Sequence, residues 1–337
     1  MTSLLKRVGF SEEWERRFKN LPEDIAPGRV ITEYKKRYLV RMEKGDMEAE
    51  LSGRLQYKAT SREDLPVVGD WVALMLEGEK ALIRYVVERK SVLARKQAGR
   101  IFEKQLLAAN VDVAFIVQAL DKDFNLNRLE RYMTVVYSGN ILPAVLLNKY
   151  DLVTPKEAER CFKTVKKRFP EISIFLTSAL YLKGIDTLRA FLKPGLTFCM
   201  VGSSGVGKST LINAIAGEKL AETGSINCST KKGVHITARR ELHCLKNGEL
   251  FIDMPGLKEI GIADAGKGLK KTFPLIYKLS EECYFDDCTH TNEPQCAVRY
   301  AVDEGILERR QYQNFLTLWK EFEHYTQQIT EKSWKKR

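Results

Sequence analysis

The chain has 337 residues, which is room for two or three domains and a substantial hydrophobic core. Its formal net charge of +11 favours an acidic partner such as a nucleic acid, although many soluble proteins are basic. No apolar run approaches the roughly 18 residues of a membrane span, no secretory signal opens the chain, and the seven cysteines form no disulfide framework, so we expect a cytoplasmic protein.

The first hundred residues predict a small extension followed by a β-barrel. Residues 1–23 include a short helix around Ser11–Lys19, with no evident function. Residues 28–93 then contain β-branched and aromatic runs separated by Gly and charged turns, and this spacing predicts five short strands that close into a barrel. The four clearest runs are 29–32, 38–40, 71–76 and 83–87.

A basic stretch follows the barrel at residues 89–104. It carries a single acidic residue, Glu103, and its cations are Arg89, Lys90, Arg95, Lys96, Arg100 and Lys104. A solvated basic face and a contact with RNA both explain such a run.

The next motif is Asn-Lys-Tyr-Asp at residues 148–151, directly after an apolar strand. A carboxylate only accepts hydrogen bonds, so Asp151 favours guanine, whose N1–H and exocyclic NH₂ are adjacent donors that adenine lacks. Asn148 can read the other edge of the ring, and the Lys149 stem can lie over its face. Alone, the motif also occurs at ordinary strand-to-helix turns.

A second strand strengthens this interpretation. Residues 172–176 are apolar and run into Thr177, Ser178 and Ala179, the Ser-Ala element that backs the base in guanine-specific GTPases. We therefore expect Ser178 and Ala179 to lie against the base.

A complete phosphate-binding loop lies at residues 202–209, between a predicted strand at 196–201 and a predicted helix at 209–216. Glycines let the backbone turn tightly and aim N–H groups at phosphate oxygens, while Lys208 can reach the β- and γ-phosphates and Ser209 can ligate Mg²⁺. The residues expected to contact nucleotide here are Gly202, Ser203, Ser204, Gly205, Val206, Gly207, Lys208, Ser209 and Thr210.

Residues 250–256 place the motif D-x-P-G at the end of another strand. Asp253 is expected to hold Mg²⁺ through water, and the Gly256 N–H to meet the γ-phosphate. The polar, Gly-containing stretch at 231–240 is suited to a mobile switch, and Thr237 is its best candidate for sensing Mg²⁺ and the γ-phosphate.

The order of these motifs is unusual, because the two guanine elements precede the phosphate loop. The same strands can form the same sheet if the chain is opened elsewhere, since permutation is tolerated where termini lie at the surface. The segment after D-x-P-G then continues into a new C-terminal region, so movement of the switch is tied to that region.

The C-terminal region begins with Cys283-x₄-Cys288-x-His290-x₅-Cys296. Three thiolates and one imidazole suit tetrahedral Zn²⁺, and four protein ligands leave no open catalytic position, so a structural zinc is predicted. The alternative is a group of reduced surface cysteines. From Glu308 onward, the sequence reads as a helix with a frayed basic end.

Permuted GTPase motifs, this Cys/His knuckle and a β-rich N-terminal region together resemble the bacterial small-subunit-dependent GTPases, the RsgA (YjeQ) family, over about residues 27–300. Residues 66–71 also resemble the family's barrel motif. The resemblance implies an OB-fold at 24–98, a circularly permuted P-loop GTPase core of α/β class at 99–275, and a helical zinc-binding domain at 276–337.

The resemblance also implies GTP and GDP as ligands with Mg²⁺, and action on rRNA late in small-subunit assembly. The family switch is G-x-H-T-T, which reads Gly-Val-His-Ile-Thr here and keeps the switch role with Thr237. His235 is implied as a catalytic aid alongside Lys208 and Thr237, because the residue after D-x-P-G is the apolar Leu257. A His that only lines the switch or contacts RNA is the alternative.

The expected function is a GTP hydrolase that docks on the small ribosomal subunit, acts as a monomer, and is stimulated by the subunit. Two other functions remain open: a nucleotide-gated RNA-binding module whose slow turnover is a timer, and a GTPase acting on tRNA or mRNA.

Overall fold

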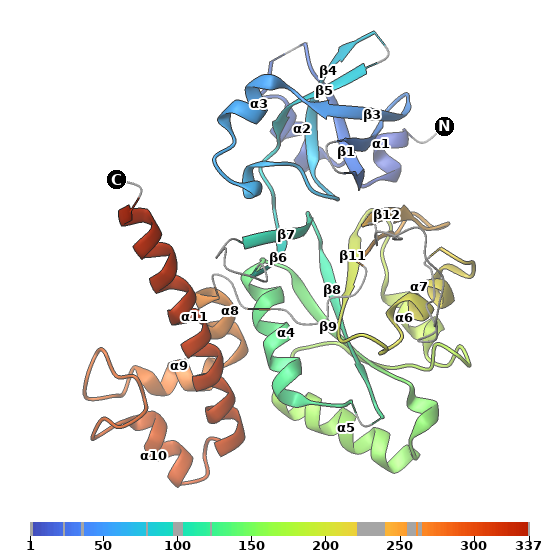
Figure 1. Ribbon diagram of the computed structural model, residues 1–337. Helices are drawn as coiled ribbons and strands as arrows, with labels where there is room; N and C mark the ends of the chain where they lie inside the picture. The colour runs from blue at the N-terminus through green and yellow to red at the C-terminus, as the bar shows by residue number, and fades with distance from the viewer. Residues whose placement is uncertain are drawn as a thin grey trace, which may run out of the picture. The chain divides into compact units, whose positions relative to one another are not determined.

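The structure is a computed structural model that describes residues 3–22, 24–34, 37–78, 80–96, 104–121, 123–220, 240–254, 261 and 265–335. The chain forms two compact units (Figure 1). The first comprises Met1–Ala94, Gln105–Phe124 and Asn140–Glu259, and the second comprises Arg95–Lys104, Asn125–Gly139 and Ile260–Arg337.

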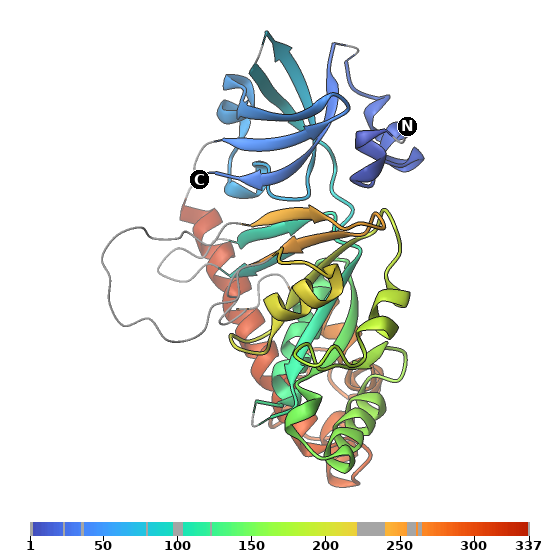
Figure 2. The same cartoon turned by 90° about the vertical axis from the view of Figure 1, so that its right-hand side faces the viewer.

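The N-terminal part of the first unit is a closed five-stranded barrel, seen from the side in Figure 2. Its strands are β1 (Ala26–Glu33), β2 (Tyr38–Met42), β3 (Gly45–Leu51), β4 (Trp71–Glu77) and β5 (Lys80–Val86). They run in the order β1-β2-β3-β5-β4, and β4 pairs back onto β1 to close the ring. The β3–β5 pair is parallel, and helix α3 (Gly53–Lys58) lies between β3 and β4 in the chain. This topology is that of an OB-fold.

The barrel interior is filled by the inward-facing residues of every strand, including Val30, Val40, Ala49, Leu74 and Ile83. Two short helices precede the barrel, α1 (Leu4–Arg7) and α2 (Glu12–Phe18), so the helix expected around Ser11–Lys19 is confirmed.

Arg29 joins these N-terminal parts to the strands that come after them in the chain. Its guanidinium is fully buried and donates to the carbonyl oxygens of Val8, Gly69 and Asn110 and to Thr197 Oγ1, the last at 2.8 Å. Because desolvation of a buried guanidinium is costly, these bonds are required, and burial lowers the pKa of Arg29 to about 10.

The rest of the first unit is the nucleotide-binding type of sheet that the motifs predict. Its strands are β8 (Val113–Ala119), β9 (Leu142–Asn148), β10 (Ile174–Leu176), β11 (Thr197–Val201), β12 (Glu241–Cys244) and β13 (Leu250–Asp253). They run in the order β10-β9-β8-β11-β13-β12, with all but β12 parallel. The same sheet continues into the barrel, because β12 pairs with β1 at Thr32 and Glu241.

Helices α6 (Ile185–Phe191) and α7 (Lys208–Ala216) bury their apolar residues on one face of this sheet. The rings of Phe115, Phe198 and Phe251 stack across three neighbouring strands beneath them, with centroids 5.5 to 6.4 Å apart. Helix α5 (Pro155–Arg168) packs beside β10, and β6 (Val92–Lys96) pairs with β7 (Lys104–Ala109) as a separate two-stranded sheet. Short 3₁₀ turns occupy Arg62–Asp64 and Tyr150–Leu152.

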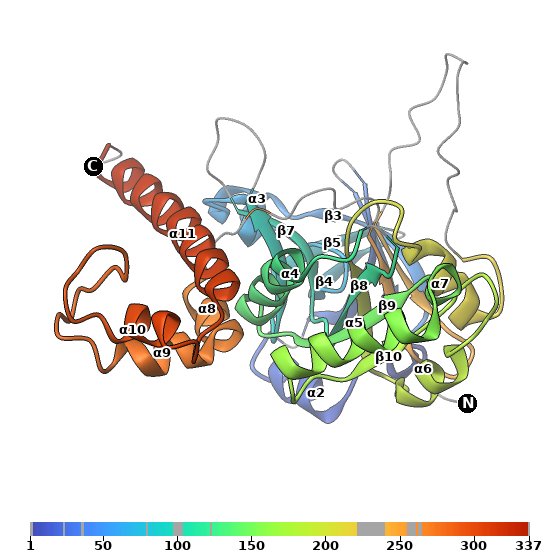
Figure 3. The ribbon, with the colours of Figure 1, turned by 90° about the horizontal axis from the view of Figure 1, so that it is seen from below.

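The second unit is helical and is seen from below in Figure 3. It contains α4 (Leu126–Ser138), α8 (Gly266–Thr272), α9 (Pro274–Ser280), α10 (Ala297–Asp303) and the long α11 (Arg309–Lys335). Helix α4 separates β8 from β9 in the sequence, yet it packs on α8 so closely that a Cβ on Gly268 would lie 2.1 Å from the Thr134 carbonyl oxygen. Among the described helices, none combines the length and hydropathy needed to cross a bilayer.

Candidate nucleotide and metal sites

The phosphate-binding loop joins β11 to α7 at the carboxyl edge of the parallel strands. This edge is where open α/β sheets bind ligands, and the first turn of α7 adds unpaired N–H groups and the positive end of the helix dipole. Gly207 has a φ of 96°, and a Cβ there would lie 2.5 Å from Asn148 Nδ2. Glycine is therefore required both by the backbone angle and by the neighbouring side chain.

Lys208 begins α7, and its ammonium lies over the loop. Its Nζ donates to the carbonyl oxygens of Gly202 at 2.8 Å and Ser203 at 2.7 Å. Burial lowers the pKa of Lys208 to about 8, against a smaller opposing effect of Asp253. An anion at this position would favour the charged ammonium, so the arrangement suits phosphate binding.

Asn148 is the residue that ties the loops together. It is buried at the end of β9 and donates from Nδ2 to the Val206 carbonyl oxygen at 2.8 Å. Its Oδ1 accepts from Thr177 Oγ1 at 3.2 Å and from the Ala179 N–H at 3.3 Å. One side chain thus fixes the phosphate loop against the Ser-Ala element, and both of its amide atoms take part in bonds within the chain.

Asp151 and Ser178 meet in the same region, because Ser178 Oγ donates to Asp151 Oδ1. The Tyr181 N–H in turn donates to Ser178 Oγ at 3.3 Å. Lys149 adopts a left-handed backbone conformation with φ 59°, and its Nζ pairs with Asp121 Oδ2 at 3.0 Å. The structure therefore brings the N-K-x-D and Ser-Ala elements together at one edge of the sheet.

Asp253 ends β13, the strand that neighbours the phosphate-loop strand. Burial raises the pKa of its carboxyl, and the nearby charges of His243 and Lys208 oppose that shift only in part. The other residues that the sequence assigns to the switch and to D-x-P-G, namely His235, Thr237, Gly256 and Leu257, lie outside the described residues.

Two residues of this edge have roles that the sequence motifs do not predict. Thr177 belongs to the Ser-Ala element, and its hydroxyl also orients Asn148. Asp121 was missed, although its place two residues beyond an apolar strand at 113–119 is a usable signal for a sheet-edge polar group.

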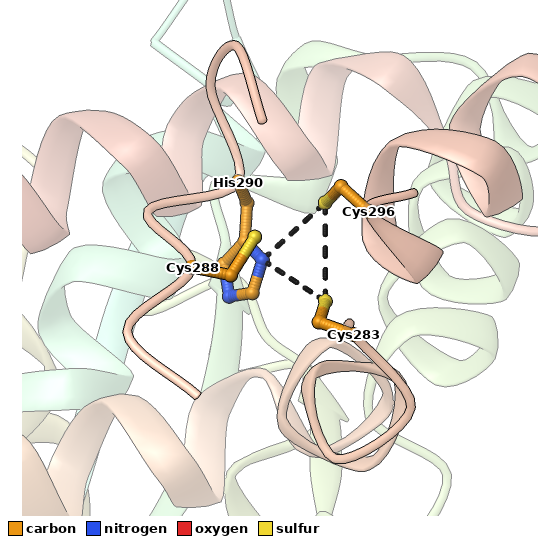
Figure 4. A group of neighbouring side chains, drawn as sticks. All are labelled: Cys283, Cys288, His290 and Cys296. Atoms are coloured by element: carbon orange, nitrogen blue, oxygen red, sulfur yellow. Dashed lines mark hydrogen bonds between the residues drawn. The ribbon is translucent and has the colours of Figure 1, made fainter. Parts of the chain in front are cut away.

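The four predicted metal ligands converge in the second unit. The ligand atoms of Cys283, Cys288, His290 and Cys296 all lie within 4.8 Å of one another. Figure 4 shows the sulfur atoms and the imidazole ring turned toward a common centre. The Cys283 and Cys296 sulfurs are 3.9 Å apart and lie 3.6 and 3.5 Å from His290 Nδ1.

These distances suit a tetrahedral zinc ion. Zn–S bonds of about 2.3 Å place the sulfurs of a tetrahedron about 3.8 Å apart. Burial lowers the pKa of His290, which keeps the imidazole neutral as a ligand must be. Burial and then the neighbouring thiols raise the pKa of Cys288 to about 12, so thiolates at this spacing require a cation among them.

The strand order, the phosphate loop and the barrel define a class of protein: a circularly permuted GTPase with an N-terminal OB-fold and a Cys₃His cluster near its C-terminus. The crystal structure of YjeQ from Thermotoga maritima has this fold, with a TM-score of 0.65 at 24% identity over 88% of this chain and 98% of that chain. YloQ, described as a circularly permuted GTPase, gives 0.62 at 23% identity over 90% and 96%.

The sequence comparisons identify the family within this class. A family model described as RsgA GTPase matches residues 86–263. A protein named small ribosomal subunit biogenesis GTPase RsgA from Methanosarcina acetivorans is 39% identical over 91% of this chain and 82% of its own length. RsgA 1 of Listeria innocua is 38% identical over 96% and 90%. The chain belongs to the RsgA GTPase family.

Proposed function

We propose that this chain hydrolyses GTP during late maturation of the small ribosomal subunit, where it binds rRNA and couples its GTP state to checking or release of assembly. The single observation that carries the proposal is the convergence of the guanine-reading and phosphate-binding elements at one sheet edge, in a sheet that continues into an OB barrel. The names of the relatives supply the small subunit as the partner.

The geometry of that edge supports the roles of the guanine-reading residues and Lys208, and the sequence motifs supply those of Ser209 and Thr237. Asp151 and Asn148, supported by Lys149, Ser178 and Ala179, select guanine, while Lys208 and the amides of the loop hold phosphate charge. Ser209, Asp253 and Thr237 organise Mg²⁺, which neutralises charge between the phosphates when bound. The chemistry is positioning and electrostatic stabilisation, because phosphoryl transfer to water needs little covalent help.

The barrel is connected to the end of the switch by paired strands. β12 begins one residue after Arg240, which closes the proposed switch at 231–240, and β12 pairs with both β13 and β1. Arg240 also lies 3.8 Å from Glu33 at the end of β1. A change in the switch is thus transmitted through these strands to the RNA-binding module.

The same proposal includes four structural and cellular points. Cys283, Cys288, His290 and Cys296 hold one structural Zn²⁺. The protein acts as a monomer in the cytoplasm. We also propose four domains, with the boundaries 1–23, 24–98, 99–275 and 276–337.

The test is GTP turnover with and without purified small subunits. Because the apolar Leu257 stands where a polar residue would hold the attacking water, the free enzyme is expected to be slow, and subunits should raise turnover at least about tenfold, or about 1.4 kcal/mol of barrier. Turnover unchanged by small subunits, but raised by tRNA or mRNA, would move the assignment to those RNAs.

His235 is tested in the same assay. His235→Ala should lose most of the stimulated rate and keep its GTP affinity, because a residue acting only in the transition state affects turnover rather than binding. His324→Ala, an exposed histidine on α11, is the control and should keep full stimulation. Full stimulation in both variants would reduce His235 to an ordinary switch residue.

A further inference from the structure

The second unit contains a groove next to the metal cluster, and two of the proposed zinc ligands, Cys288 and His290, form part of its lining. It is a cavity of about 250 Å³, several times the roughly 30 Å³ of one water molecule. Its walls come from α9, the loop between Glu281 and Gln295, and α11. We call it the aromatic groove, after its ring-bearing residues Tyr277, Phe285, Phe315 and Trp319.

Three rings of the groove pack against one another, and Phe315, which is 3% exposed, lies behind the other two. Phe315 and Trp319 stack with centroids 5.9 Å apart, and Tyr277 meets them edge-on at 6.0 and 6.5 Å. Phe285 stands on the opposite loop and is 39% exposed. Aromatic faces carry negative charge in their quadrupole, so a cation placed among them is attracted.

The rim of the aromatic groove is acidic. Asp286, Asp287 and Glu323 line it and are exposed, and none of the three forms an ion pair among the described residues. The aromatic rings and the acidic side chains therefore both favour a positively charged ligand.

The surrounding sequence extends this preference. From Glu281 to Glu304 the chain carries seven Asp or Glu residues and only one Lys or Arg, Arg299, whereas the whole chain has a net charge of +11. This segment would repel a phosphate backbone and attract a lysine- or arginine-rich peptide, whereas helices α9 and α11 also carry the cations Lys278 and Lys320.

We propose that the aromatic groove is a docking site for a basic protein segment, with a lysine or arginine side chain lying against the exposed rings of the groove and its charge facing Asp286, Asp287 and Glu323. The partner is thus a protein with a Lys/Arg-rich segment rather than RNA. This inference does not depend on GTP hydrolysis, because none of these residues belongs to the nucleotide edge. It does rest on the folded metal cluster, since Cys288 and His290 also line the groove.

The experiment measures binding of a fluorescein-labelled Lys/Arg peptide of about ten residues to the full zinc-loaded chain by fluorescence anisotropy. Salt is held near 0.15 M so that exposed charges are screened beyond about 8 Å. The groove variant Asp286→Asn/Asp287→Asn/Glu323→Gln should bind at least about tenfold more weakly. The matched control Glu281→Gln/Glu282→Gln/Glu304→Gln removes the same charge outside the groove and should change affinity less than about threefold.

Two further measurements separate the groove from general attraction. Phe285→Leu keeps an apolar side chain but removes a ring, and should weaken binding about two- to fivefold, as expected for loss of one exposed cation–π contact of about 0.5–1 kcal/mol. Acetylation removes the charge of the peptide's lysines, so it should abolish their contribution to the binding affinity. Zinc content and melting temperature are measured for each variant, so that a failure to fold is recognised.

Three results would overturn the proposal. The first is an equal loss in the groove variant and the matched control, which would indicate diffuse attraction. The second is that substituting the groove carboxylates changes the binding of a single-stranded oligonucleotide but not the binding of the peptide. The third is Phe285→Leu binding as tightly as the unaltered chain, with zinc retained.

Discussion

The nucleotide edge and the metal cluster are both built from loops, but different forces hold them in place. The loops of the nucleotide edge leave parallel strands, of which β8 and β11 are buried along their whole length. Asn148 connects two of these loops by three hydrogen bonds. Between Glu281 and Gln295, by contrast, His290 is the only buried residue among those that the structure describes. The strands of the sheet hold the nucleotide edge in place, whereas the metal cluster depends on an ion bound by its four side chains.

This difference predicts opposite responses to ligand removal. A site positioned by a hydrophobic core keeps its geometry when its ligand leaves, because burial of strands does not depend on the ligand. A loop with no apolar core of its own gains its folding free energy from the metal, on the order of 10 kcal/mol for small zinc sites. Loss of the metal should therefore disturb the chain more than any single change at the nucleotide edge.

The largest effect is expected from the metal ligands. Cys283→Ala/Cys288→Ala should abolish zinc binding and unfold the segment between α9 and α10, while GTP affinity changes little. Elemental analysis measures the zinc, and limited proteolysis measures the order of the segment.

The control for that variant is Cys161→Ala/Cys244→Ala, which removes two cysteines outside the cluster. It should retain one zinc per chain. Zinc retained in the ligand variant, or no zinc in the unaltered protein, would contradict the assignment.

The second effect concerns the hydrogen bonds that hold the nucleotide edge. Asn148→Ala removes all three bonds and leaves buried partners unpaired, so it should destabilise the protein by about 2–4 kcal/mol. Thr177→Val removes only one of the three and should cost about 1 kcal/mol. Chemical unfolding measures the loss in free energy of unfolding for each variant. Equal losses for the two variants would show that Asn148 does not connect the loops.

The sequence predicted the parts of these sites more completely than their connections. The phosphate loop, the guanine motif and the Cys/His spacing each lie within a few consecutive residues, so local pattern is enough to find them. Asn148 forms hydrogen bonds with Val206, 58 positions further along the chain, and with Ala179, 31 positions further along. Only the folded sheet brings these residues together. The sequence motif alone predicts only a contact between Asn148 and the base.

The barrel shows a similar limit. Five strands were expected, but β3 has the sequence Gly-Asp-Met-Glu-Ala-Glu-Leu and lacks β-branched residues. Its alternation does place Met47, Ala49 and Leu51 against the barrel interior. Tertiary pairing with β2 and β5 thus outweighs a weak intrinsic preference for the strand. Helix α4 was not predicted, and its place in the second unit depends on contacts with α8 and α11 that no local pattern contains.

The third effect concerns base selection at the nucleotide edge. Asp151→Asn replaces an acceptor-only carboxylate with a group that also donates, so GTP affinity should fall about 10- to 100-fold and xanthosine triphosphate should bind better than GTP. Calorimetry with both nucleotides measures the change, and Asp186→Asn, on exposed α6 surface, is the control. ATP binding as tightly as GTP in the unaltered protein would refute guanine selection.

The smallest effect is a pH dependence that only the nucleotide edge should show. In the folded chain burial lowers the pKa of Lys208 from 10.5 to about 8, so charging Lys208 costs stability below pH 8, and that cost disappears as pH rises toward 10.5. A bound phosphate reverses the preference, because it favours the ammonium. Nucleotide binding should therefore take up a proton above pH 8, and GDP affinity should fall about tenfold between pH 7 and pH 9.

Lys208→Arg stays charged throughout this range and should show a flatter profile, whereas zinc content should not change in either protein. Calorimetry in two buffers of different ionisation enthalpy counts the proton directly. Equal pH profiles for the Lys and Arg proteins would mean that Lys208 is already fully charged before the phosphate arrives.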